Sequence, residues 1–138
     1  MPRSLIYGNP KIRIEKEYIM ADVQRPPVAG KGPAFMKETL AVFKDIAGNL
    51  DAFPDSSANK IKSTLEAKAQ DVEPLLSRAY MKTVKAGETS YDCKVLAEGL
   101  YQCVQAGNEA DALDNLGKLE THLDGLIHKV KTFVVRMT

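Results

Sequence analysis

The sequence predicts an all-α protein: an up-and-down bundle of four to five helices, preceded by a loosely ordered N-terminal extension and a Pro/Gly linker. Three observations predict this class. Apolar residues recur at steps of three and four through most of residues 34–137. Proline and glycine lie mainly between these stretches. With 138 residues, 44% of them hydrophobic, the chain is long and apolar enough for one domain with its own core.

Residues 1–33 are predicted to lie outside the bundle, which then covers residues 34–138. Ile12 and Ile14 alternate with charged residues in a short strand-like pattern, and Met20 resembles a second natural start. We expect residues 1–19 to be a poorly ordered extension, with docking as an edge as the alternative. Residues 22–33 are a linker, because tandem prolines favour polyproline II and do not continue a helix.

The first helix is expected over residues 34–50, where one apolar stripe comprises Met36, Leu40, Phe43, Ala47 and Leu50. The second is expected from near Ser57 to Val84, with a stripe of Ile61, Leu65, Ala69, Val72, Leu76, Tyr80 and Val84. Pro74 interrupts this run, and because the stripe stays in phase across it we favour a single kinked helix. A break at Glu73 is the alternative.

The third helix is expected after Ala86-Gly87-Glu88, with Thr89 and Asp92 as its N-terminal capping pair and Gly107 as its C-cap. Its inward side is Cys93, Leu96, Leu100, Cys103 and Val104.

Asn108 is predicted to cap the last helix, with carboxylates at its positive end. A heptad-like stripe follows, made of Ala112, Leu116, Leu119, Leu123, Leu126, Val130, Phe133 and Met137. We expect it to be the core of the bundle, with pairing to another chain as the alternative. Gly125 leaves open a break that would give a fifth helix.

The residues give no pattern for catalysis, a cofactor or a metal. His122 and His128 are six residues apart, about 120° around a helix, so they do not share a face. Cys93 and Cys103 are ten residues apart, about 15 Å along one helix, which is too far for a disulfide. We therefore expect free thiols in a reducing, cytoplasmic location and no enzymatic activity, catalytic residue, cofactor site or metal site.

Protein partners remain the expected ligands. The formal net charge of +1 makes nucleic acid an unlikely partner, no apolar run is long enough for membrane insertion, and no small-molecule cradle is visible. Tyr80, Tyr91 and Tyr101 are the candidate partner-binding residues, because tyrosine combines apolar area with a polar tip.

Residues 95–119 read as a helix, a short Gly-Asn turn and an Ala-Asp-Ala-Leu opening of the next helix. This stretch resembles the C-terminal helical domain shared by the outer COPII vesicle-coat scaffold protein and the steroid receptor RNA activator protein. Two amphipathic helices and a Pro/Gly-rich segment precede the turn in that family, as in residues 25–84 here. The chain departs from the family in its longer connection over residues 85–92 and its lack of tryptophan.

The resemblance would cover residues 34–137, and it implies a stand-alone scaffold domain in ER-to-Golgi vesicle transport, associated with a membrane coat. The first alternative is a coregulator domain that acts with RNA or transcription factors, with the nucleus as the alternative location of the protein. The second is an obligate structural subunit of a larger assembly.

Overall fold

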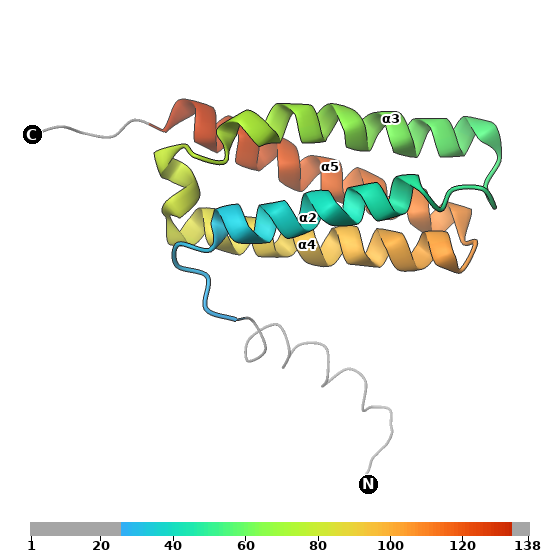
Figure 1. Ribbon diagram of the computed structural model, residues 1–138, viewed down its shortest axis with the longest axis horizontal. Coiled ribbons are helices and arrows are strands. Elements are labelled where there is room, and N and C mark those ends of the chain that lie inside the picture. Colours follow the sequence, from blue (N-terminus) through green and yellow to red (C-terminus); the bar gives the residue numbers. More distant parts are fainter. Residues whose placement is uncertain (1–25, 134–138) are drawn as a thin grey trace, which may run out of the picture.

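The protein is all-α, as predicted. The computed structural model describes residues 26–133, and the helices of this part form a bundle of four long helices (Figure 1). Two short 3₁₀-helices connect the second long helix to the third. In chain order the elements are α2 (Gly32–Ala47), α3 (Asp55–Val72), η1 (Glu73–Leu75), η2 (Ala79–Lys82), α4 (Val84–Gln105) and α5 (Glu109–Thr132).

Consecutive long helices run antiparallel, so α2–α3 and α4–α5 are two helical hairpins (Figure 1). The hairpins lie side by side in the same orientation. Lys94 Nζ lies 3.3 Å from Glu38 Oε1, which joins α4 to α2. Lys68 Nζ lies 2.6 Å from Asp124 Oδ1, which joins α3 to α5. Each helix therefore packs against its antiparallel partner in the hairpin and a parallel helix of the other hairpin.

The contact between α2 and α4 is the most extensive of these. Both helices bury small side chains: Ser90 and Ala97 of α4 and Thr39 of α2 are fully buried. Thr39 Oγ1 donates to the carbonyl oxygen of Phe35 at 2.8 Å, which satisfies its hydroxyl inside the helix. The Ser90 hydroxyl has no hydrogen-bond partner within the described part of the chain.

The apolar stripe of α5 is core, as predicted. Its six members from Ala112 to Val130 are each at most 3% exposed. Asn108 Oδ1 accepts a hydrogen bond from the backbone N–H of Asp111, which confirms the predicted cap. The helix passes through Gly125 without a break. Phe133 differs from the prediction: it follows the end of the helix and is 43% exposed, and Met137 lies outside the described residues.

The prediction of one kinked helix across Pro74 was wrong, and the alternative of a break at Glu73 is confirmed. Helix α3 ends at Val72, and η1, a turn and η2 follow. Pro74 lacks the N–H that would continue the α-helical ladder, whereas the 3₁₀ turn places it in its first positions, where no N–H is needed. Leu75 and Met81 are still buried, so the chain keeps an inward side without being one helix.

The start of the next helix was also predicted wrongly. Helix α4 begins at Val84, and Thr83 caps it by accepting a hydrogen bond from the backbone N–H of Ala86 at 3.1 Å. Ala86 and Gly87 lie inside its first turns and do not end a helix. Val84, predicted to point inward, is 52% exposed.

The end of the predicted linker lies against the bundle. Gly30, at φ +73°, makes a turn in which the Lys31 N–H donates to the carbonyl oxygen of Val28 at 3.0 Å. Helix α2 then begins at Gly32, two residues before the predicted start. The strand-like pattern at Ile12 and Ile14 lies outside the described residues.

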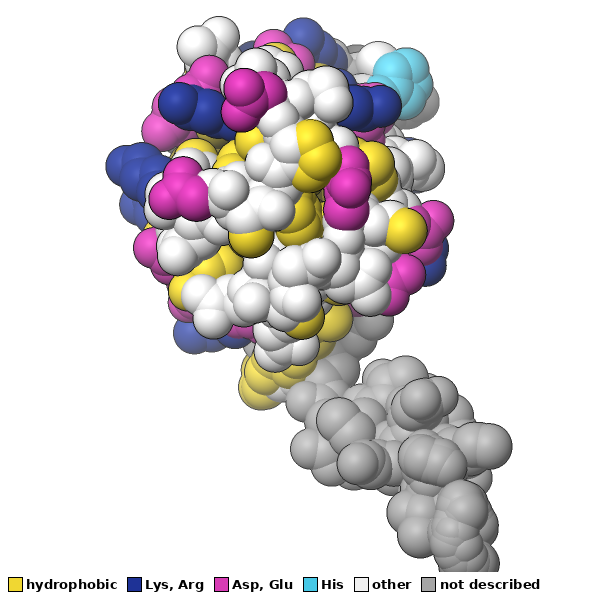
Figure 2. Space-filling model, turned by 90° about the vertical axis from the view of Figure 1, so that its right-hand side faces the viewer, with side chains coloured by type: hydrophobic (Ala, Val, Ile, Leu, Met, Phe, Trp, Pro, Cys, Tyr) yellow, Lys and Arg dark blue, Asp and Glu magenta, His cyan; other side chains and the backbone are white. Residues whose placement is uncertain are grey.

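Two surface features complete the fold. Within residues 26–133, no helix has both the length and the apolar character needed to cross a membrane. At the end of the bundle that carries residues 48–54 and 106–108, apolar side chains form small patches separated by charged ones (Figure 2). This end offers no broad apolar surface.

Candidate functional site

The three candidate tyrosines are all half-buried, and each has different neighbours. The ring of Tyr80 lies 5.3 Å from that of Phe133, and the ring of Tyr91 lies 5.3 Å, edge to face, from that of Phe35. Tyr101 accepts a hydrogen bond from Gln105 Nε2 at 2.7 Å. The contacts do not bring the three rings into one cluster, and their role in partner binding stays a prediction.

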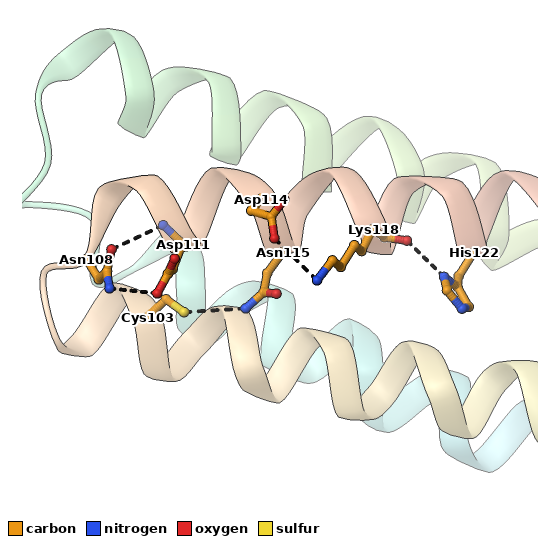
Figure 3. A network of polar contacts seen from close by, with 7 residues as sticks. All are labelled: Cys103, Asn108, Asp111, Asp114, Asn115, Lys118 and His122. Atoms are coloured by element: carbon orange, nitrogen blue, oxygen red, sulfur yellow. Dashed lines mark hydrogen bonds and ion pairs between the residues drawn. The ribbon is translucent and has the colours of Figure 1, made fainter.

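Both cysteines are free thiols on α4, as predicted. Cys93 is fully buried, and this burial, with a smaller effect of Asp92, raises the pKa of its thiol to about 12. A thiol with this pKa stays protonated near neutral pH and is a poor nucleophile. Cys103 is half-buried, and its Sγ accepts a contact from Asn115 Nδ2 at 3.4 Å (Figure 3).

The two histidines are exposed on α5. His122 Nδ1 lies 2.9 Å from the carbonyl oxygen of Lys118, one turn earlier in the helix (Figure 3). Among residues 26–133, no three His, Cys, Asp or Glu side chains are grouped closely enough to hold a metal ion.

The surface between α2 and α3 is hollowed. One depression, with a volume of about 470 Å³, has Leu40, Phe43, Leu65 and Ala69 among its lining residues. A second, of about 460 Å³, lies beside it and extends to Ala41 and Leu76. Both are lined by Leu40, Lys44 and Glu73, so they form one continuous feature, which we call the α2–α3 groove.

The floor of the α2–α3 groove is apolar and its edges carry charges of both signs. Phe43 and Leu65 belong to the core and are 4% and 2% exposed, whereas Leu40, Ala69 and Leu76 are half-buried. Three lysines and three acidic residues also line it: Lys37, Lys44, Lys62, Asp45, Glu66 and Glu73. An apolar floor with charged edges is typical of surfaces that receive a protein segment.

The dimensions of the α2–α3 groove correspond to about three turns of a helix. Its lining runs along α2 from Lys37 to Ala47, positions that are ten residues apart and separated by about 15 Å of helix rise. The side chains at i, i+3 and i+7 of a docked helix span about 10 Å, which is within this length.

Sequence reasoning did not predict the α2–α3 groove, although it named Leu40, Phe43, Leu65 and Ala69 as stripe residues. Their spacing shows that they share the inner side of their helices. It does not show how closely α2 and α3 approach each other, and these helices contact each other less than α2 and α4 do.

The chain matches no protein-family model, and it has no significant match among curated proteins or solved structures.

Proposed function

We propose that this chain is a non-enzymatic protein-interaction module that receives an amphipathic helix of a partner protein in its α2–α3 groove. The observation that carries the proposal is the set of half-buried apolar side chains that line the α2–α3 groove, Leu40, Ala69 and Leu76. They lie beside the buried Phe43 and Leu65, so the apolar surface continues into the core. Helix-in-groove binding uses such a floor for the apolar anchors of the partner and charged edges to set its register.

The chemistry of the edges also supports a peptide helix as the occupant. Lysines and carboxylates both line the groove, and this mixture of charges suits a partner helix with both signs of charge beside its apolar side. A small molecule would need polar groups that converge on one point, whereas these charges are spread along both helices.

A narrower proposal comes from the resemblance of residues 95–119. This segment forms the C-terminal part of α4, the turn at Gly107, and the N-terminal half of α5. On this resemblance, the partner would be a component of the vesicle coat that acts between the ER and the Golgi.

The test is affinity purification with the full chain as bait, followed by quantitative mass spectrometry. Ala41 is exposed and lines the α2–α3 groove, so Ala41→Glu places a charge there without disturbing the core. Ala67→Glu is the matched control, because Ala67 is exposed on α3 and does not line the groove.

We expect at least one partner that the wild-type chain and Ala67→Glu retain and that Ala41→Glu loses. Chemical cross-linking should connect the chain to a helical segment of this partner. Identical partner sets for all three baits would contradict the proposal. A lost partner that is not a coat component would contradict only the vesicle-transport assignment.

A further inference from the structure

A second groove lies elsewhere on the bundle, between η2, the first turns of α4 and the C-terminal half of α5. It has a volume of about 310 Å³. Its lining shares no residue with the α2–α3 groove. We call it the basic groove because of the side chains described next.

Lys85, His122 and Lys129 line the basic groove, and no Asp or Glu is among its lining residues. Both lysines are exposed, and neither forms an ion pair within residues 26–133. On α5, Glu120 and Asp124 are each two residues from His122 in the sequence, and the carboxylate of Asp124 pairs with Lys68 at 2.6 Å. The two lysines of the basic groove are therefore without an ion-pair partner in the described part of the chain.

The basic groove also has an apolar wall. It is formed by Leu126, which is 3% exposed, and by the half-buried Tyr80. Thr89, a half-buried residue with a hydroxyl-bearing side chain, also lines the groove. Cationic, apolar and hydroxyl groups thus meet in one depression.

Gly125 is the unusual member of the lining. Glycine in the interior of a helix costs up to about 1 kcal/mol relative to alanine. A Cβ at Gly125 would meet nothing within 4 Å, so packing inside the bundle does not require glycine there. Any side chain at this position would instead extend into open space at the basic groove.

We propose that the basic groove binds an acidic peptide segment of a partner protein, with one of its apolar side chains placed against Leu126 and Tyr80. His122 and Lys129 are seven residues apart on α5, so they share a face about 10 Å apart along its axis. Lys85 faces them from α4. Carboxylates spaced along a peptide match this spread of cations, whereas a single phosphate requires donors that converge on one point.

The test begins with selection from a random 12-residue peptide library on the full 138-residue chain. Enriched peptides are synthesised, and their affinity is measured by fluorescence anisotropy. We expect acidic sequences with an aromatic or aliphatic residue, whose binding weakens as the salt concentration rises. The double variant Lys85→Glu/Lys129→Glu should bind them at least tenfold more weakly.

Gly125→Gln and Gly117→Gln are the matched pair for the shape of the site. Both glycines lie inside α5 with nothing within 4 Å of an added Cβ, but only Gly125 lines the basic groove. We expect Gly125→Gln to weaken binding at least fivefold and Gly117→Gln to leave it unchanged. Ala41→Glu should also leave it unchanged, which separates this site from the α2–α3 groove.

Several results would overturn the inference. These are a selection without enriched acidic peptides, binding that survives the lysine reversals, and equal effects of the two glutamine variants. Inorganic phosphate and vesicles of phosphatidylserine with phosphatidylcholine serve as competing probes. If either binds more tightly than the peptides and loses affinity in the same variants, the ligand is phosphate or a lipid surface and the peptide proposal fails.

Discussion

Gly87 lies directly against the carbonyl oxygen of Val28: a Cβ built on Gly87 would come within 2.1 Å of this oxygen. The contact places the residues before α2 against the first turns of α4. The carbonyl oxygen belongs to the backbone, so it cannot move away by rotation of a side chain. We predict that Gly87→Ala lowers the free energy of unfolding by about 1–3 kcal/mol, the usual cost of overpacking. Chemical denaturation followed by circular dichroism measures this change.

Gly99→Ala is the control for Gly87→Ala. Gly99 lies in the same helix, and its nearest neighbour to an added Cβ, Asn115 Nδ2, is 3.6 Å away in ordinary contact. Alanine there should raise stability by up to about 1 kcal/mol, because it favours the helix more than glycine does. Equal effects of the two substitutions would show that Val28 does not restrain Gly87.

Much of the bundle followed from periodicity. The apolar stripe of α5 was predicted member by member up to Val130, because an uninterrupted helix displays its buried side at regular steps. Asn108 was predicted as a cap because its side chain acts on a backbone N–H three residues away, which is a local relationship.

The errors lie where local patterns allow two structures. A stripe in phase across Pro74 fits one kinked helix, and it fits equally a helix followed by 3₁₀ turns that bury Leu75 and Met81. Gly87 was interpreted as a helix end, whereas glycine is needed there because Val28 approaches its backbone closely. Val28 and Gly87 are 59 positions apart, so no local pattern could show this contact. The two grooves also depend on how the helices pair in space, and the residue pattern of a single helix does not predict this pairing.

Cys93 should make stability depend on alkaline pH. Burial raises its thiol pKa from 9.0 to about 12, so above pH 9 the unfolded chain loses this proton while the folded chain keeps it. The unfolded state then binds fewer protons, and stability falls by up to about 1.4 kcal/mol per pH unit between pH 9 and pH 12. Denaturation curves of wild type and Cys93→Ala at pH 8 and pH 10.5 test this.

The variant is expected to be less stable at pH 8, because it leaves a small cavity, but to lose less stability on going to pH 10.5. The same pH change affects tyrosines and lysines in both proteins, so the difference between the two proteins isolates Cys93. Equal losses in both would contradict the burial of its thiol.

Leu126→Asp should abolish folding. Leu126 is 3% exposed, so its truncation alone costs about 2–5 kcal/mol, and an unpaired buried carboxylate adds several more. Their sum approaches the about 5–15 kcal/mol of stability that a domain has. Leu123→Asp, at a fully buried position of the same stripe, should behave alike, whereas Tyr101→Ala should fold. Circular dichroism and thermal melting measure all three; cooperative melting of either aspartate variant would mean that the stripe is not core.

The ion pair between Lys68 and Asp124 should contribute little stability although it joins the two hairpins. Its hydrogen bond raises the pKa of Lys68, so the contribution is present below pH 10.5 and is lost as the pH rises through the higher folded value. The carboxylate is 58% exposed, which favours screening by water and salt. A double-mutant cycle with Lys68→Met and Asp124→Asn at pH 7 should give a coupling free energy of at most about 1 kcal/mol, which declines in 1 M NaCl.

Lys118 and Asp114, an exposed pair one turn apart on α5, should couple by only about 0.3–0.5 kcal/mol. A coupling of 2 kcal/mol or more for Lys68 and Asp124 would mean that this contact, and not the apolar stripes, holds α3 against α5.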